Sequence, residues 1–397
     1  MRNIVIVGGI RTPFGRMGGG LRQFHMADLA GMTIKELVDR YQLDPEEVDA
    51  VFLGSALHDG RTFNAARFAT LYAGMPHKTS SVFMEMQCGS AIACINHAAY
   101  RMMAGEADVV IAGGAESYSQ RFAKFSMSVE PYKLFPPTPM PSMLSPHPED
   151  QLSMIQISDR MAQKWGLSRE DCDAFALRSQ TLTRQAMDEN FFEGHVMPVV
   201  IPGTRKVPEQ IICIDEHPRP GTTLEGLAKL RSVLEGGVTT AGNASGLNDG
   251  AAAVLMMTEE KAKALGLTPI MRWVGGTDIG VDPKFMGIGP AFSNVKLLRS
   301  KGLKISDIDV FECNEAFAAQ NLSVIREMED QMGEKINMDT WNPKGGAIAM
   351  GHPNGASGAR LAMYAMRQLE RSNGRYAMIS SCCGGGLGVS TLFEKYE

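Results

Sequence analysis

Short apolar runs alternate with amphipathic segments over the first third of the chain. Four runs predict buried strands, and they cover residues 3–7, 48–53, 83–86 and 108–112. Apolar residues recur at helical spacing over residues 28–40, 65–73 and 90–104. Alternation of strands and helices is typical of an α/β fold, so we predict a sheet whose strands are largely parallel.

The second half of the chain repeats the pattern of the first. Four pairs of segments correspond in order: Val7-Gly8-Gly9 with Val274-Gly275-Gly276, residues 47–52 with 307–312, Ser90 with Ser357, and residues 109–114 with the strand 377–380 and the glycines after it. Their offsets of 267, 260, 267 and about 268 residues agree apart from differences in loop length. Chance matching of short apolar runs is the alternative, but four ordered matches favour duplication. We therefore predict two like α/β units related by pseudo-twofold symmetry.

A segment of different character separates the two units. Residues 135–148 hold six prolines in fourteen positions, which predicts a stiff, irregular loop. Helical periodicity follows over residues 151–165 and 168–190, where Ser168 has the features of an N-cap with acidic residues in the first turn. We expect short strands and turns over residues 195–214 and a glycine-rich hinge over 240–246.

The chain then returns to the first unit through an all-apolar strand at residues 251–257. These patterns predict a first unit at 1–117 and 246–268, an inserted loop or lid domain at 118–245, and a second unit at 269–397. An insertion placed over the ends of the strands would suit a domain that holds a ligand.

Composition narrows the class of protein. Of the 397 residues, 44% are hydrophobic and 21% charged, so a large core can form and disorder is not expected. The net charge of −5, without a long basic run, does not suggest nucleic-acid binding. No run approaches the roughly 20 apolar residues of a membrane span. Seven scattered cysteines without a secretory signal point to a reducing, cytoplasmic setting.

Cys88 lies where the predicted strand 83–86 gives way to the helix that begins near Ser90. The N-terminus of a helix carries partial positive charge, which we expect to lower the pKa of the thiol and to favour the thiolate. Strand ends in α/β folds are also the usual places for ligands. A cysteine buried only for packing is the alternative.

His352 lies in the glycine-rich stretch GGAIAMGHPNGASGAR, residues 345–360. Pro353 stiffens the backbone after it, and the flanking glycines let the main chain approach a ligand closely. Ser357 opens a segment with helical periodicity. This arrangement suggests a catalytic histidine, with an inert histidine in a turn as the alternative.

Two further strand ends carry reactive groups. Cys382 and Cys383 precede Gly384, Gly385 and Gly386, whose backbone N–H groups could face a ligand as an oxyanion site requires. Asn314 could hold a substrate oxygen, although asparagine is common in turns and caps and glycines are common in tight turns.

The duplication places Cys88 and the His352 loop ahead of matching helices, and Asn314 and Cys382 after matching strands. We expect these four residues to converge near the strand ends at the junction of the two units. Together they supply the groups for nucleophilic acyl transfer with a second acid/base.

Five segments together resemble the thiolase family. They are IRTPFG near the N-terminus, TAGNASGLNDGAAA at residues 240–253, NEAF at 314–317, GGAIAMGHPNGASGAR at 345–360, and the closing CCGGGLG at 382–388. The resemblance covers essentially the whole chain and is strongest to acetyl-CoA acetyltransferases and 3-ketoacyl-CoA thiolases. It implies a five-layered αβαβα fold of two like halves with a loop domain inserted in the first.

The resemblance also implies a role for each candidate. Cys88 matches the nucleophile that becomes an acyl-thioester, and His352 matches the base that activates it. Cys382 matches the acid/base that exchanges the α-proton of the second acyl-CoA. Cys383 occupies a variable spacer position and is expected to be a bystander.

The remaining implied roles concern oxyanions and CoA. Asn314 with His352 resembles the oxyanion hole for the enolate, and the N–H groups of Cys88 and Gly384 resemble the hole for the tetrahedral intermediate. The residues expected to contact the acyl-CoA are Ser245 at the pantetheine arm, Met154 and Met286 in the pocket wall, Ala316, Phe317, and Arg219 near the nucleotide. The resemblance implies CoA thioesters as substrates, no required cofactor or metal, a place in fatty acid metabolism, and a homodimer or homotetramer tethered by the inserted domain.

Three features depart from the family pattern. Glu85 stands where the family usually has Asn three residues before the nucleophile, and Ala91 stands where it usually has Gly. Residues 154–160 (MIQISDR) replace the usual stretch of the lid. A Glu85 that pointed inward would raise the pKa of Cys88, but we expect it to pair with a cation or to face solvent.

We therefore expect an acyl-CoA C-acyltransferase that joins two acetyl-CoA molecules reversibly into acetoacetyl-CoA and free CoA. Two alternatives remain: a degradative 3-ketoacyl-CoA thiolase for longer or unusual chains, and a non-catalytic acyl-CoA or lipid-binding protein on the same scaffold.

Overall fold

The computed structural model describes residues 2–127, 129–203, 205 and 207–397. Its centre is one ten-stranded sheet in the order β14-β15-β16-β13-β1-β12-β5-β3-β4, with the short β2 paired to β12. The strands are β1 (Ile4–Arg11), β2 (Gly15–Arg16), β3 (Ala50–Gly54), β4 (Ser80–Met84), β5 (Val109–Ser117), β12 (Asn248–Thr258), β13 (Met271–Gly280), β14 (Val310–Cys313), β15 (Tyr376–Cys383) and β16 (Leu387–Lys395).

The predicted duplication is confirmed by the order of the strands. The first half runs β1-β12-β5-β3-β4, and the second repeats this order as β13-β16-β15-β14. A bridge between Phe311 and Trp341 stands where the first half has β4. Register shifts occur at Val7 in β1 and at Val274 in β13, positions that the sequence repeat makes equivalent. Pairing of Ile6 with Met271 joins the two halves into one sheet.

The prediction of largely parallel strands is wrong. Among the strands that the structure describes in this sheet, three pairs are parallel: β3–β4, β3–β5 and β14–β15. The antiparallel pairs are β1–β12, β12–β5, β12–β2, β1–β13, β13–β16 and β15–β16. Helical crossovers connect parallel neighbours, but a tight turn such as the one between β15 and β16 can only join antiparallel strands. No helix lies between β15 and β16, so the alternation of helices and strands in the sequence could not predict β16.

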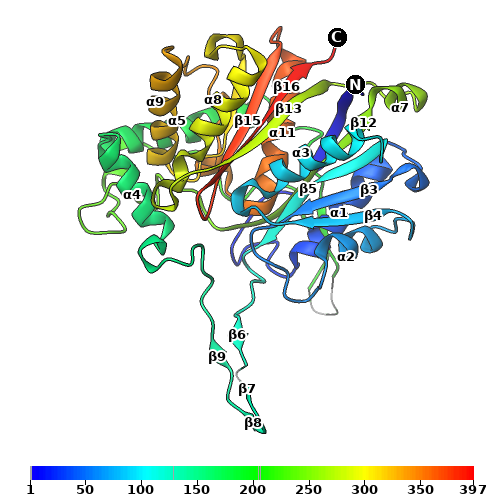
Figure 1. The fold of residues 1–397 in the computed structure, drawn as a ribbon, viewed down its shortest axis with the longest axis horizontal. Coiled ribbons are helices and arrows are strands. Elements are labelled where there is room, and N and C mark those ends of the chain that lie inside the picture. The colour runs from blue at the N-terminus through cyan, green and yellow to red at the C-terminus, as the bar shows by residue number, and fades with distance from the viewer. Residues whose placement is uncertain (1, 128, 204, 206) are drawn as a thin grey trace.

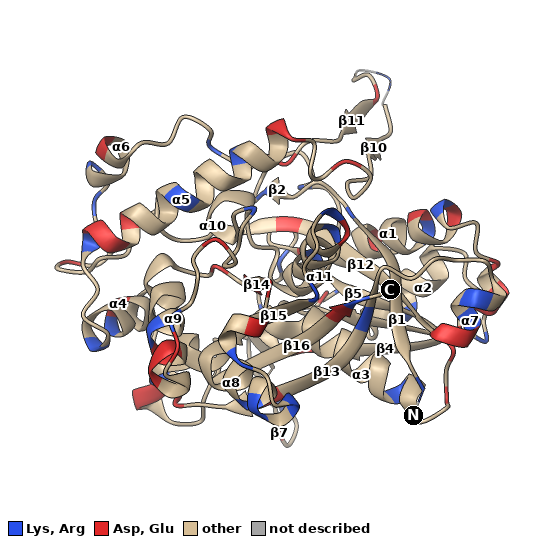
Figure 2. Cartoon of the chain, turned by 90° about the horizontal axis from the view of Figure 1, so that it is seen from above, with Lys and Arg blue, Asp and Glu red and all other residues tan. Residues whose placement is uncertain are grey.

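Helices complete five layers. They are α1 (Met26–Arg40), α2 (Ala65–Tyr72), α3 (Ser90–Met103), α4 (Met154–Lys164), α5 (Arg169–Asp188), α6 (Leu224–Ala228), α7 (Glu259–Ala264), α8 (Gly289–Lys301), α9 (Ala318–Met332), α10 (Ala347–Met350) and α11 (Asn354–Arg371). Helices α1 and α2 cover the outer face of the first half-sheet, and α8 covers that of the second with α9 packed on it. Helices α3 and α11 lie between the half-sheets, and Figure 2 shows α11 at the centre with β14 and β15 on one side and β5 and β12 on the other.

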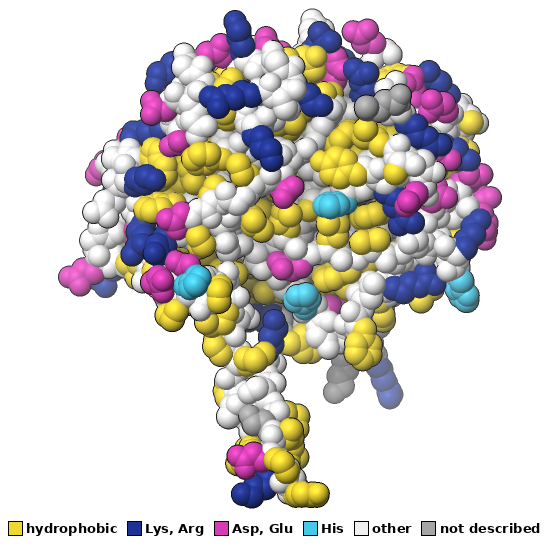
Figure 3. Space-filling view, viewed as in Figure 1, with side chains coloured by type: hydrophobic (Ala, Val, Ile, Leu, Met, Phe, Trp, Pro, Cys, Tyr) yellow, Lys and Arg dark blue, Asp and Glu magenta, His cyan; other side chains and the backbone are white. Residues whose placement is uncertain are grey.

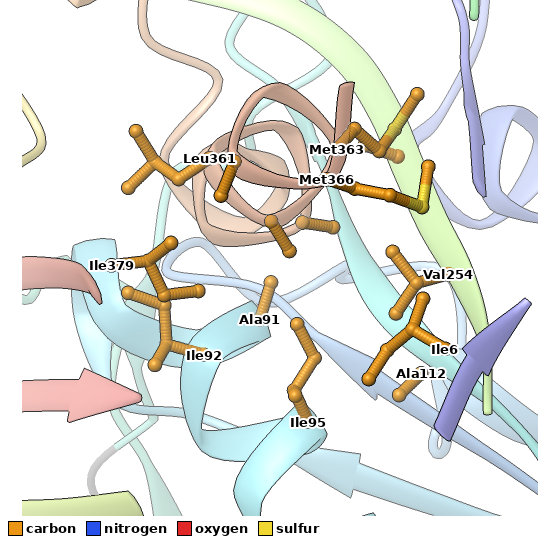
Figure 4. Packing of buried hydrophobic residues seen from close by; sticks show 14 of the residues in the cluster. Ile6, Ala91, Ile92, Ile95, Ala112, Val254, Leu361, Met363, Met366 and Ile379 are labelled. Carbon is orange, nitrogen blue, oxygen red and sulfur yellow. The ribbon is translucent and has the colours of Figure 1, made fainter. Parts of the chain in front are cut away.

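Most residues of α3 and α11 are buried in this middle layer, and most of the buried ones are small or apolar. In Figure 4 side chains of α3, α11 and both half-sheets meet in one cluster that includes Ile6, Ala91, Ile92, Ile95, Ala112, Val254, Leu361, Met363, Met366 and Ile379. A Cβ added at Gly358 would lie 2.6 Å from Ile92 Cγ1 and 3.2 Å from Ala91 Cβ. The two helices can cross this closely only because α11 has glycine there, and Ala91 is accommodated opposite it.

The inserted segment forms helices and a projecting arm. Ser168 caps α5 as predicted, because its side chain accepts a hydrogen bond from Asp171 N. The arm is made by β6 (Phe125–Ser126) paired with β9 (Thr138–Pro139), and by β7 (Val129–Glu130) paired with β8 (Lys133–Leu134). It extends away from the body of the protein (Figure 1). The proline-rich loop predicted at 135–148 thus begins within the arm.

Beyond the arm, β10 (Val199–Ile201) and β11 (Gln210–Ile212) pair as a small sheet inside the segment predicted to hold short strands. Thr204 and Lys206, which fall in that segment, lie outside the described residues. Across the part of the chain that the structure describes, no helix combines the length and apolarity that a bilayer crossing requires.

Candidate active site

Cys88 lies at the N-terminus of α3, in the short turn η2 (Gln87–Gly89) that follows β4. The Ser90 hydroxyl donates to Gln87 O over 2.7 Å and closes this turn. Asn354, the first residue of α11, donates from Nδ2 to Cys88 Sγ over 3.2 Å. The predicted nucleophile of the first unit therefore contacts the helix that the second unit contributes to the middle layer.

The thiol of Cys88 rests in its protonated form. Although the residue keeps some exposed surface, its thiol is densely surrounded by protein, and this burial raises its pKa well above the usual value. The charges of Cys382 and Glu116 raise the pKa further, against a hydrogen bond from Asn354. The prediction that the helix N-terminus lowers this pKa is wrong, because desolvation outweighs the partial charge of the first turn. Attack by Cys88 consequently requires a base.

His352 is held at both ring nitrogens. Nδ1 lies 2.6 Å from Ser357 Oγ, and Nε2 lies 3.3 Å from Asn314 Nδ2. The Ser357 hydroxyl donates to Pro353 O over 3.1 Å, so its oxygen is left to accept a proton from Nδ1–H. This assignment leaves the lone pair on Nε2. Asn248 Oδ1 accepts from the backbone N–H of His352 and fixes the loop.

The imidazole is neutral at rest. Burial lowers the pKa of His352 to about 3, and the positive charge of Arg360 contributes in the same direction. A neutral imidazole with its lone pair on Nε2 can act as a base, and the amide of Asn314 beside it can donate to a substrate oxygen.

Cys382 and Cys383 end β15 with their side chains on opposite faces. Cys382 is fully buried, and burial raises its pKa to about 12, with the nearby Cys313 adding to the rise. Cys383 packs against the residue after the nucleophile, since a Cβ at Gly89 would lie 2.5 Å from Cys383 Sγ. Ionisation of Cys382 would raise the pKa of Cys88, and ionisation of Cys88 or Cys382 would raise the pKa of Cys383, so the three sulfurs lie within electrostatic reach of one another. Burial raises the pKa of Cys383 as well.

Gly384 lies beside the nucleophile turn. A Cβ at Gly384 would lie 3.2 Å from Gln87 Cγ and 3.4 Å from Leu144 Cδ2. Its N–H makes no backbone hydrogen bond within the described residues, which leaves that group available to a ligand. Gly385 and Gly386 have φ of 86° and 92°, values that favour glycine and give the turn its shape.

The expected acyl-CoA residues fall into two places. Met154, Met286, Ala316 and Phe317 belong to the same hydrophobic cluster as Cys382. Ser245 joins them through its backbone N–H, which donates to Ala316 O over 3.0 Å.

Arg219 instead lines a cavity of about 190 Å³ in the inserted segment, together with His217, Gln180, Thr222 and Ile348. Ile348 lies on α10, four residues before His352, so this cavity adjoins the His352 loop.

Glu85, one of the departures from the family pattern, makes its hydrogen bonds within the nucleophile turn. Glu85 is exposed, as expected, but its partner is not a cation: Oε1 accepts from both the backbone N–H and Nε2 of Gln87, each over 2.7 Å. Gln87 has φ of 47°, a left-handed conformation that this double hydrogen bond stabilises.

Sequence reasoning missed Glu116 and Asn354. The Glu116 carboxylate accepts hydrogen bonds from Ala56 N, Leu57 N and Gly355 N, and so ties β5 to the start of α11. Burial raises its pKa to about 7. A signal existed for Asn354, which stands two residues after His352, whereas Glu116 lies four residues beyond the predicted strand 108–112. Among the described residues, no group of three or more His, Cys, Asp or Glu is arranged to hold a metal ion.

Comparison with known proteins identifies both halves. Residues 4–260 match the thiolase N-terminal domain, and residues 267–395 match the thiolase C-terminal domain. The chain is 42% identical to the 3-oxoadipyl-CoA/3-oxo-5,6-dehydrosuberyl-CoA thiolase of Escherichia coli strain K12, with full coverage of both chains. Among solved structures, Bacillus anthracis acetyl-CoA acetyltransferase and human mitochondrial 3-ketoacyl-CoA thiolase each superpose with a TM-score of 0.89 at 35% identity, covering 100% of this chain and 99% of theirs.

Proposed function

This chain belongs to the thiolase family, and we propose that it is an acyl-CoA C-acyltransferase that cleaves and forms 3-oxoacyl-CoA through an acyl-cysteine at Cys88. The observation that carries the proposal is the junction of the two halves. There a protonated thiol contacts the first residue of α11, and a neutral imidazole on the preceding loop carries its lone pair on Nε2, beside the amide of Asn314.

In the cleavage direction, His352 Nε2 takes the proton of Cys88, and the sulfur attacks the 3-oxo carbon. The N–H groups of Cys88 and Gly384 would donate hydrogen bonds to the resulting oxyanion. Each such donor lowers the activation barrier by about 3–4 kcal/mol. The C2–C3 bond then breaks, and the electron pair passes to an acetyl-CoA enolate whose oxygen is held by Asn314 and His352. Cys382, whose raised pKa keeps it protonated, donates a proton to C2.

Free CoA completes the cycle. The Cys382 thiolate takes back a proton from the His352 imidazolium, and the neutral imidazole then accepts the proton of the CoA thiol as the CoA sulfur attacks the acyl group on Cys88. The Cys88 sulfur leaves and regains its proton from His352. Every step is reversible, so the same groups condense two acyl-CoA molecules when product accumulates.

The substrate is the finer part of the proposal. Acetoacetyl-CoA, formed from two acetyl-CoA molecules, is the substrate that the sequence suggests. The name of the E. coli relative favours a second candidate, a 3-oxoacyl-CoA that ends in a carboxylate. The buried apolar cluster around Met286 and Phe317 supports an acyl pocket wall but does not itself distinguish these chains.

Steady-state thiolysis of three substrates tests this. Acetoacetyl-CoA sets the short-chain rate, while 3-oxohexanoyl-CoA and 3-oxoadipyl-CoA form a matched pair of equal length that differs in a terminal methyl or carboxylate. A higher kcat/KM for acetoacetyl-CoA supports the acetyl-CoA reaction, and a preference for 3-oxoadipyl-CoA over 3-oxohexanoyl-CoA supports the carboxylated substrate. No thiolysis of any of the three would contradict the proposed activity.

Assembly into a homo-oligomer belongs to the same proposal. The arm exposes apolar side chains such as Phe125, Val129, Tyr132 and Leu134, and Figure 3 shows hydrophobic side chains at its tip. The strand β4 ends the sheet with an unpaired edge. Exposed apolar surface of this kind supports burial against further copies of the chain. Light scattering at micromolar concentration distinguishes a monomer from a dimer or tetramer.

A further inference from the structure

Arg360 is a buried charge that the reaction described above does not use. Its side chain is fully buried on α11, and none of its three guanidinium nitrogens has a hydrogen-bond partner among the described residues. The guanidinium carbon lies 4.8 Å from the centroid of the Tyr364 ring. Burying an ion without a directly bonded counter-ion is costly, so its retention in this position calls for a role.

The place of Arg360 relates it to His352. It lies one helical turn beyond Ser357, whose hydroxyl contacts Nδ1 of the imidazole. On the neighbouring β14, Glu312 lies two residues before Asn314, whose amide contacts Nε2. Side chains two apart on a strand share a face, and α11 packs on β14. Arg360 therefore lies one helical turn from Ser357, and Glu312 lies two residues from Asn314, on the two elements α11 and β14 that hold the imidazole's partners; Figure 2 shows these elements side by side at the centre of the molecule.

Glu312 does not neutralise this charge at acidic pH. Its Oε1 accepts from Gln368 Nε2 over 2.8 Å, while Oε2 has no partner among the described residues. Burial raises the pKa of Glu312 to about 8, against the influence of Arg360, so the carboxyl is largely protonated below neutral pH. The other charged groups around the pair are Glu315 and Arg178 near Glu312, and Arg11 with its partner Asp215 near Tyr364.

We propose that Arg360 is a positioning residue that acts through charge: its buried guanidinium keeps the His352 imidazole neutral at pH values where an ordinary imidazole is protonated. The inference rests on the proposed role of His352 as the base. Burial is the main cause of the lowered pKa of His352, and among the described residues Arg360 is the charged group that adds to it. Only the neutral form of the imidazole can accept a proton from the Cys88 thiol, which burial keeps protonated at rest by raising its pKa.

The test is the titration of His352, followed by NMR on protein with ¹³C-labelled histidine and assigned with His352→Asn. In the unaltered protein this histidine should show no titration above pH 5. Arg360→Met removes the charge and should raise the midpoint by one unit or more, a tenfold or greater gain in proton affinity. Arg360→Lys keeps the charge and should retain the original behaviour. Arg360→Gln serves as a second neutral variant if the methionine variant does not fold.

Glu312→Gln is the matched control. Because the carboxyl is already protonated below neutral pH, this variant should leave the His352 titration unchanged. The proposal is overturned if His352 titrates near its ordinary value in the unaltered protein, if both neutral variants titrate as the original does, or if Glu312→Gln moves the midpoint as far as Arg360→Met. Failure of the proposed function is a different result: the unaltered protein would catalyse no thiolysis, while Arg360→Met would still raise the titration midpoint of His352.

Discussion

The contact between Asn354 and Cys88 offers a perturbation that separates reactivity from folding. Asn354 donates from Nδ2 to Cys88 Sγ over 3.2 Å, and Tyr118 Oη donates to Asn354 Oδ1 over the same distance. Asn354→Asp keeps the size of the side chain but replaces the amide donor with a carboxylate. Since Asn354 is the first residue of α11, an acidic group there also suits the positive end of the helix, so the free energy of unfolding should not fall.

The effect on the thiol should be large. A hydrogen bond to a charged group contributes about 1.5–3 kcal/mol, and the thiolate of Cys88 would lose one. The carboxylate adds repulsion, so both changes raise the pKa of Cys88, and less thiolate is present at any fixed pH. This energy corresponds to a loss of about 10–100-fold in the rate of alkylation by iodoacetamide, because 1.36 kcal/mol is one unit of pKa.

The assay is alkylation of Cys88 as a function of pH, followed by mass spectrometry of the modified peptide. Tyr118→Phe is the control, because it removes a neighbouring hydroxyl and leaves the donor to Cys88 in place; it should cost much less than Asn354→Asp. Alkylation of the aspartate variant at the original rate and with the original pH midpoint would refute the view that this amide stabilises the thiolate.

Three further outcomes follow from the same geometry. Cys382→Ala should still be acylated at Cys88 by acetyl-CoA but should not condense or cleave substrates, and normal condensation would rule out its assigned role. Gly358→Ala should lower the free energy of unfolding in urea by about 1–3 kcal/mol, because its Cβ would lie 2.6 Å from Ile92 Cγ1; an unchanged denaturation midpoint contradicts the close crossing of α3 and α11. Glu116 has a folded-state pKa of about 7, above its value in the unfolded chain, so the folded state holds the proton more tightly and stability falls as pH rises from about 4.5 to 7, by on the order of 3 kcal/mol in full. Glu116→Gln should flatten that fall between pH 5 and 7.5, and an equally steep fall in the variant would assign the pH dependence to other groups.

The duplicated architecture could be predicted from the sequence because repeated apolar runs at constant offset record the repeated unit directly. Even the register shifts at Val7 and Val274 fall at positions that the repeat pairs. The direction of the strands could not be predicted in the same way. Helix–strand alternation reports only the crossovers, whereas β1, β12, β13 and β16 pair through contacts between segments far apart in the chain.

The site, like the fold, could be predicted from the sequence only in part. Residue types at strand ends and ahead of helices pointed to Cys88, His352, Asn314 and Cys382, and the structure places Asn314 beside His352 and the sulfurs near one another. Their protonation could not be inferred, because the pKa of Cys88 depends on how closely two distant helices pack around it. The environment of the site, including Glu116 and Arg360, is likewise a product of tertiary packing and has no local signal strong enough to single it out.

The central claim is that Cys88 carries the acyl group, and peptide mass spectrometry tests it most directly. Brief incubation with acetoacetyl-CoA, or with acetyl-CoA in the absence of free CoA, followed by acid quenching and digestion, should give a 42 Da acetyl adduct on the peptide that contains Cys88. The adduct should disappear on addition of CoA, with acetyl-CoA as the product. An adduct confined to Cys382 or Cys383, or no adduct while substrate is consumed, would contradict this account.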